Sequence, residues 1–112
     1  MSEIERLKKN TDFKNVYKKG KSIADKYIVI CFLRNNMNMT RVGYTASKKV
    51  GKSVIRNRAR RLMKESFRNN NENVKAGYDI VFIARARIKD AEYIEVEKSL
   101  KRVVKKACKY MD

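Results

Sequence analysis

Two short runs of β-branched and aromatic residues constrain the fold of this 112-residue chain most strongly. The first extends from Lys26 to Leu33 and the second from Tyr78 to Ala84. Residues of these types favour strands, and a strand without polar alternation is typically covered on both faces. The two runs therefore predict strands at the centre of a sheet against which helices pack.

The remaining elements are predicted from periodicity and from turn residues. A short helix over Thr11–Lys18 is predicted to be capped by Thr11 or Asn10 and to end at Gly20. Asparagines at 35, 36 and 38 predict a turn, so the next strand, Thr40–Ser47, is expected to form a hairpin with the first apolar run. The other predicted helices are Ser53–Asn69 and Ala91–Tyr110. The whole chain, residues 1–112, is thus expected to form one domain, a two-layer α/β sandwich with a small mixed sheet and the order α-β-β-α-β-α.

The charge of the chain points to a polyanionic partner. Lys and Arg number 29 against 12 Asp and Glu, which gives a formal net charge of +17. Such an excess repels itself across a folded surface, so nucleic acid is the first expected partner and an anionic membrane surface the second. The longest apolar run, Tyr27 to Leu33, is far shorter than the roughly 20 residues of a membrane span. The N-terminus does not resemble a signal peptide, and we expect a cytoplasmic protein that does not bind membranes.

The residue types exclude several kinds of chemistry. The chain has no histidine, which excludes Ser-His-Asp and Cys-His nucleophilic sites. Cys31 and Cys108 are far apart in the sequence, so no metal site is expected and both are predicted to be buried and reduced. No pair of carboxylates has an apolar context that would raise a pKa for acid–base catalysis. Any catalysis is therefore expected to be carried out by another molecule.

The segment from Lys48 to Arg68 carries nine basic residues and one acid, Glu65. Solvated helix faces normally alternate the two signs of charge, whereas Arg56, Arg60 and Lys64 are spaced i, i+4 and repel one another. This pattern predicts contact with RNA or DNA. The aromatic residues on the first helix have two interpretations that the sequence leaves open: they stack on unpaired bases, or they attach the helix to the sheet.

The same segment resembles the signature of the bacterial ribonuclease P protein component. That pattern is Lys-x-Gly, a small-apolar pair, Arg-Asn-Arg, one spacer, two basic residues and an acidic or amide residue. It is matched here by the contiguous run Lys48-Lys49-Val50-Gly51-Lys52-Ser53-Val54-Ile55-Arg56-Asn57-Arg58-Ala59-Arg60-Arg61-Leu62-Met63-Lys64-Glu65. The Asp12-Phe13 helix, the Arg41-Val42-Gly43 strand and the basic last helix also follow the layout of the family.

The resemblance implies a left-handed crossover between parallel strands and two RNA-binding surfaces. The expected contacts with the catalytic RNA subunit are Lys49, Lys52, Arg56, Asn57, Arg58, Arg60, Arg61 and Lys64. The 5′ leader of precursor tRNA is expected in a separate cleft between the first helix and the sheet, bound by Phe13, Tyr17, Lys14 and Lys18. Cys31 stands where family members often carry an aromatic residue, so one stacking surface is missing if that position faces the cleft.

The function implied is that of the protein subunit of ribonuclease P, which removes the 5′ leader from precursor tRNA. The catalytic RNA would perform the hydrolysis with Mg²⁺ that it mainly holds itself, and the protein would be monomeric in the holoenzyme. A ribosomal or other structural RNA-binding protein is the first alternative, against which the Arg-Asn-Arg helix speaks. A self-contained nuclease is the second, and it would need a carboxylate cluster that Asp25, Asp79, Asp90 and Glu92 do not evidently form in the sequence.

Overall fold

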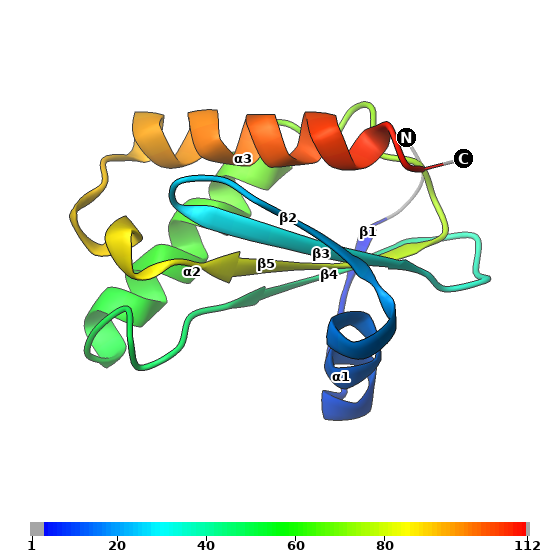
Figure 1. Cartoon of the computed structure of the whole chain (residues 1–112), viewed down its shortest axis with the longest axis horizontal. Coiled ribbons are helices and arrows are strands. Elements are labelled where there is room, and N and C mark those ends of the chain that lie inside the picture. Colours follow the sequence, from blue (N-terminus) through cyan, green and yellow to red (C-terminus); the bar gives the residue numbers. More distant parts are fainter. Residues whose placement is uncertain (1–3, 112) are drawn as a thin grey trace.

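A five-stranded mixed sheet forms the middle of the molecule in this computed structural model, which describes residues 4–111 (Figure 1). The strand order across the sheet is β1-β4-β5-β3-β2. The elements along the chain are β1 (Ile4–Arg6), α1 (Asn10–Lys19), β2 (Lys21–Ala24), β3 (Ile28–Arg34), β4 (Thr40–Thr45), α2 (Ser53–Arg68), β5 (Tyr78–Ala84), the 3₁₀ helix η1 (Ala86–Asp90) and α3 (Tyr93–Cys108).

The two apolar runs are neighbours at the centre of the sheet, as predicted. β3 pairs antiparallel with β5 along its whole length, and six of the seven residues of β5 are buried. The predicted hairpin between β3 and β4 is wrong, because β5 lies between these strands and β4 pairs with it in parallel. Because β5 lies between β3 and β4, its backbone forms hydrogen bonds with a strand on each side and it has no unpaired edge.

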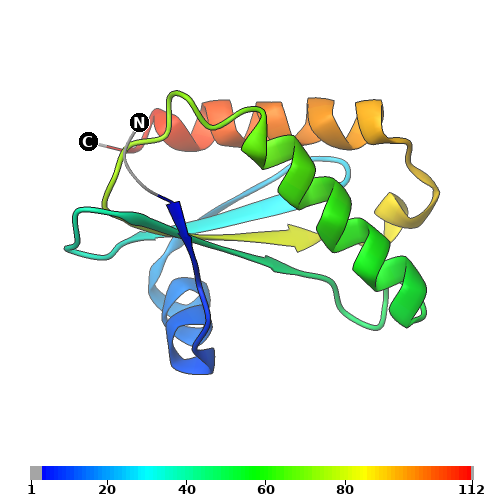
Figure 2. The same cartoon turned by 180° about the vertical axis from the view of Figure 1, so that it is seen from behind.

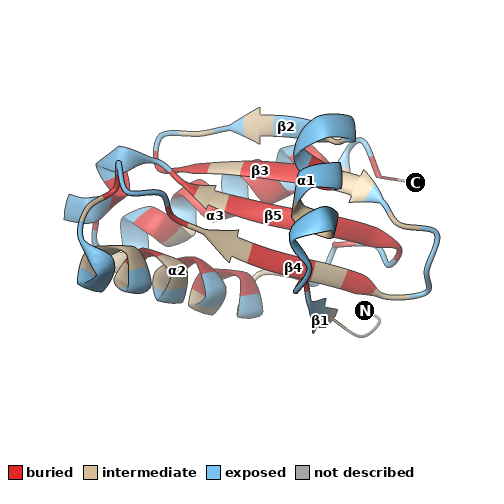
Figure 3. Ribbon diagram, turned by 90° about the horizontal axis from the view of Figure 1, so that it is seen from below, coloured by how far each residue is buried: buried red, intermediate tan, exposed pale blue. Residues whose placement is uncertain are grey.

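Chain reversal between β3 and β4 does occur where the asparagines predict it. Asn36 adopts a left-handed backbone conformation with φ of 60°. From β4 the chain passes through α2 to reach β5, its parallel neighbour. In Figure 3 both arrows point to the left, β5 lies above β4 and α2 passes behind the sheet, so the crossover is left-handed, contrary to the usual preference.

Two strands were not predicted from the sequence, and both lie at the edges of the sheet. β1 pairs in parallel with β4, and β2 pairs antiparallel with β3. Each is three or four residues long and mostly exposed, which is typical of edge strands and leaves little apolar pattern to detect. In the order of elements, β1 precedes the first predicted helix, β2 follows it, and η1 precedes the last helix.

Helices cover both faces of the sheet. α2 and α3 lie together on one face (Figure 2), and α1 lies alone on the other (Figure 1). The main core is formed under α2 and α3, where the ring of Phe67 packs on Phe82 with centroids 5.0 Å apart. A smaller cluster under α1 consists of Leu7, Val16, Cys31 and Val81.

The short helix α1 begins and ends differently from the prediction. Its N-cap is Lys9, and no side chain caps it, so the predicted capping by Thr11 or Asn10 is wrong. Gly20 ends the helix as expected, although its φ of −80° is not left-handed. A glycine is needed there because a Cβ would lie 2.5 Å from the Val16 carbonyl oxygen and 2.6 Å from that of Phe32.

Candidate nucleic-acid interface

Helix α2 separates its apolar and cationic residues onto two sides. The buried side consists of Ala59, Met63, Ser66 and Phe67, which recur at helical spacing and pack on the sheet. Arg61 and Lys64 lie between these positions and are exposed to solvent. The helix has no acid in its first turn and no side-chain cap at Lys52, so its N-terminal N–H groups are open to an anion.

A cleft of about 630 Å³ lies between this cationic side and the edge of the sheet. Its walls come from α2, from β1 and the residues after it, from β4, and from Phe13 of α1. The expected site residues that line it are Asn57, Arg60, Arg61, Lys64 and Phe13. The sequence had assigned Phe13 to a separate cleft, whereas the structure brings it to the same cleft as the Arg-Asn-Arg helix.

The cationic side chains of α2 and of the loop before it differ in whether they bond to other groups of the protein. Arg58 donates from Nη2 to the Ala91 carbonyl oxygen at 2.8 Å and is half-buried. Arg56 donates to the Ser53 hydroxyl at 3.1 Å, and Arg60 donates to Oδ1 of Asn57. Of the cations expected to contact the RNA subunit, four are exposed and form no ion pair with an acid of residues 4–111, namely Lys49 and Lys52 before the helix and Arg61 and Lys64 on it.

The two aromatic residues of α1 differ in how far they are buried. Phe13 is half-buried on Gly43 of β4, so it attaches the helix to the sheet while it lines the cleft. Tyr17 is 46% exposed, and its ring centroid lies 6.5 Å from that of Phe13. Lys14 and Lys18 of the same helix are exposed.

The cysteines behave as core or near-core residues. Cys31 lies on the face of the sheet that α1 covers, but it is only 7% exposed and is packed with Val16. Burial raises the pKa of its thiol, and the side chain does not form a wall of the cleft. Cys108 is only partly buried, so the prediction of burial is confirmed for Cys31 and wrong for Cys108; both cysteines are free.

Tyr44 lines the cleft and was not predicted as a site residue. Its ring stacks on Phe82 at a centroid distance of 5.7 Å, and burial raises the pKa of its phenol, which remains protonated at neutral pH. The sequence signal was the position of Tyr44 next to Arg41-Val42-Gly43 in a predicted strand. The sequence did not single out Tyr44, because it does not show that this side chain lies beside α2.

The carboxylates among the described residues are dispersed or paired with arginines. Among residues 4–111 no three acids or cysteines come together in a way that would hold a metal ion. Asp79 pairs with Arg41, and Asp25 pairs with Arg102. The same part of the chain also contains no helix with the length and hydropathy that a bilayer crossing requires.

The fold and the interface together define a class of protein, a small α/β domain that presents a cationic helix beside an aromatic-lined cleft. This is the arrangement expected of an RNA-binding subunit.

Comparison with known proteins identifies the family. The family model for ribonuclease P matches residues 1–108. The ribonuclease P protein component of Alkaliphilus oremlandii is 56% identical over 95% of this chain and 93% of its own length, and that of Clostridioides difficile is 55% identical over 89% of each. The Staphylococcus aureus RNase P protein structure aligns with a TM-score of 0.83 at 38% identity, over 91% of this chain and 94% of that one. For the Thermotoga maritima RNase P protein the TM-score is 0.76 at 34% identity, over 88% and 97% of the two chains.

The chain belongs to the ribonuclease P protein family. The resemblance found in the sequence is thereby confirmed, and the ribosomal alternative gains no support. Membership makes the chain a subunit of the endoribonuclease that matures the 5′ end of tRNA.

Proposed function

We propose that this chain binds the catalytic RNA of ribonuclease P through α2 and the loop before it, and holds the single-stranded leader of precursor tRNA against α1. The observation that carries the proposal is the shared cleft, which Arg60, Arg61 and Lys64 of α2 line together with Phe13 of α1. A structured RNA docked on α2 would thus lie beside the groups that bind an unpaired strand.

The α2 surface is suited to phosphates. Arginine makes forked hydrogen bonds to phosphate, and the exposed Arg61 has its donors available. Gly51 has a φ of +150°, which shapes the turn that places Lys49 and Lys52 at the N-terminus of the helix. The positive end of the helix dipole adds to their charge, so a phosphate is favoured at this end.

The α1 surface is suited to unpaired bases. Stacking of a base on an aromatic side chain contributes about 1–3 kcal/mol and does not depend strongly on which base is present. Tyr17 offers a ring that is nearly half exposed, and Phe13 lines the cleft. Lys14 and Lys18 would neutralise the phosphates of the same strand.

The chemistry of the cleavage would belong to the RNA. The acids described here are dispersed or held in ion pairs with arginines, so these residues do not fit a protein-held Mg²⁺. We therefore propose that Mg²⁺ is held mainly by the catalytic RNA, where it would supply the nucleophile and stabilise charge. The protein, as a cytoplasmic monomer in the holoenzyme, would neutralise phosphates between the two RNAs and lower the metal concentration that cleavage requires.

Cleavage of precursor tRNA by the protein alone, by the RNA alone and by both together tests the proposal. At low Mg²⁺ only the mixture should release the leader, and neither component alone should be active. Cleavage by the purified protein alone would support the self-contained nuclease instead. RNA copurified from cells with the tagged protein should be the ribonuclease P RNA, whereas ribosomal RNA alone would contradict the assignment.

A further inference from the structure

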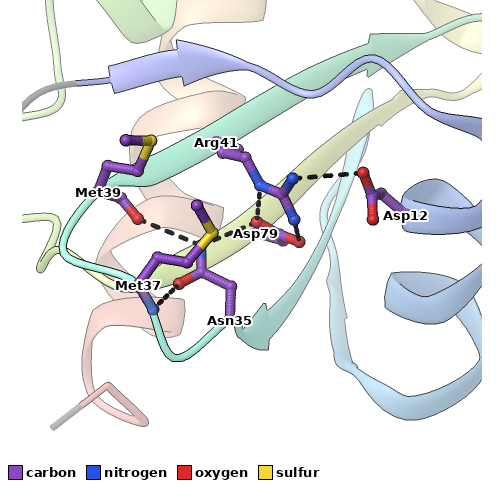
Figure 4. Close-up of polar contacts among 6 residues, drawn as sticks. All are labelled: Asp12, Asn35, Met37, Met39, Arg41 and Asp79. Atoms are coloured by element: carbon purple, nitrogen blue, oxygen red, sulfur yellow. Dashed lines mark hydrogen bonds and ion pairs between the residues drawn. The ribbon is translucent and has the colours of Figure 1, made fainter.

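A nearly buried ion pair joins the two central parallel strands below α1 (Figure 4). The Arg41 guanidinium donates from Nε to Oδ1 of Asp79 at 2.8 Å and from Nη2 to Oδ2 at 2.6 Å. Asp79 is only 5% exposed, and the Asn35 amide also donates to its Oδ1 at 2.9 Å. The carboxylate is therefore well satisfied, and the orientation of the guanidinium is fixed by two parallel bonds.

The third arm of the same guanidinium reaches α1. Nη1 of Arg41 donates to Oδ2 of Asp12 at 3.3 Å, and both side chains are about one-fifth exposed. Asp12 lies in the first turn of α1, directly before Phe13. The neighbouring contact along β4 is also with α1, because the Phe13 ring lies where a Cβ on Gly43 would be, 2.5 Å from that position.

Two adjacent residues of α1 are thus held by two residues of β4 on one face of the sheet. Arg41 and Gly43 are two residues apart on β4, so both lie on the face of the sheet that α1 covers. A helix of ten residues is marginal in isolation and depends on such tertiary contacts. Val16 is the one residue of α1 that is fully buried, so the contacts of Asp12 and Phe13 with β4 supplement a small apolar contact.

We infer that Arg41 is a positioning residue for the leader: fixed by Asp79, it holds Asp12 and so sets where α1 presents Phe13 and Tyr17. The inference rests on the proposed leader contact and adds to it a residue that need not touch RNA. Asp12 is also an acid on a surface proposed to bind a polyanion. Plain electrostatics predicts that its removal tightens the binding of precursor tRNA, whereas the positioning role predicts that its removal weakens it.

The test uses Asp12→Asn in the reconstituted holoenzyme, with Asp25→Asn as the matched control. Both changes remove one negative charge and one ion pair that ties a helix to the sheet, because Asp25 accepts from Arg102 of α3 at 2.7 Å on the opposite face. The dissociation constants of precursor tRNA and of mature tRNA are measured for each. Asp12→Asn should lower the preference for the precursor about three- to fivefold, and Asp25→Asn should leave this preference unchanged.

Two further variants give the test its direction. Asp12→Lys places a cation beside Arg41 and should lower the preference more than Asp12→Asn, although it adds positive charge near the RNA. Phe13→Ala should lower it as well, by removing the stacking ring. An equal or tighter precursor preference with Asp12→Asn, or an equal loss with Asp25→Asn, overturns the positioning role. If Phe13→Ala retains the full preference for the precursor, both the proposed leader contact and the positioning role are refuted. If Phe13→Ala lowers the preference and the Asp12 variants retain it, the leader contact stands and only the positioning role is refuted.

Discussion

Single substitutions along α2 should separate cations that are free to bind phosphate from cations that the fold already uses. Arg61 is exposed and forms no ion pair with an acid in residues 4–111, whereas Arg58 is half-buried and bonded to the Ala91 carbonyl. Arg61→Gln should therefore reduce the number of phosphate contacts, and Arg58→Gln should mainly reduce stability. The contrast is informative because both residues lie within the same family motif.

The magnitude follows from counterion release. Each phosphate contact contributes about 0.7 to 0.9 to the slope of log affinity against log salt concentration. Arg61→Gln should lower the slope by that amount, and Arg58→Gln should lower it much less. Combined Gln substitutions at Arg60, Arg61 and Lys64, which line the cleft, should lower it by about 2.1 to 2.7. Over a fourfold rise in salt the triple variant should then lose about 20- to 40-fold less affinity than the unsubstituted protein.

The assay is filter binding of the catalytic RNA over a series of salt concentrations, with urea denaturation of each variant in parallel. A triple Gln variant at Lys75, Arg87 and Lys89, which are exposed and lie away from the cleft, removes the same charge and serves as the control. Equal slope changes for Arg58→Gln and Arg61→Gln would refute the distinction between free and engaged cations. A control variant that lowers the slope as much as the cleft variant would show a diffuse charge effect and would refute the α2 surface itself.

Three further changes test the fold around the site. Gly43→Ala places a methyl group against the Phe13 ring and should lower the free energy of unfolding by about 1–3 kcal/mol in a urea titration. It should also weaken the binding of precursor tRNA more than that of mature tRNA, and unchanged precursor binding would contradict the packing of Phe13 on Gly43. Phe82→Ala removes a fully buried ring that packs on Phe67 and Tyr44, and should cost about 3–5 kcal/mol of unfolding free energy. The hydrogen bond from Arg102 lowers the pKa of Asp25 from 3.8 to about 2. The ionised Asp25 therefore contributes roughly 1–2 kcal/mol to the free energy of unfolding above pH 4, and this contribution is lost as the pH falls toward 2. Arg102→Met should remove this part of the acid dependence of stability.

The sequence by itself determined the elements that have strong periodicity. The strand Tyr78–Ala84 and the start of α2 at Ser53 were located to the residue, because continuous apolar runs and a sharply two-sided helix are local patterns. The family motif in α2 was equally local, and it identified the function class before any pairing was known. The cationic side of α2 followed from which of its positions repeat with the helical period.

The tertiary structure alone decided what each buried face packs against. Periodicity shows that β4 has a buried side, but it does not show whether β3 or β5 will pair with it, since both offer the same backbone groups. The insertion of β5 between β3 and β4 places Arg41 beside Asp79 and brings Phe13 to the cleft of α2. Asp79 lies 38 positions from Arg41, and the α2 residues of the cleft lie 44 to 51 positions from Phe13. The free energy that selects such distant neighbours comes from the packing of the whole core, which no local pattern contains.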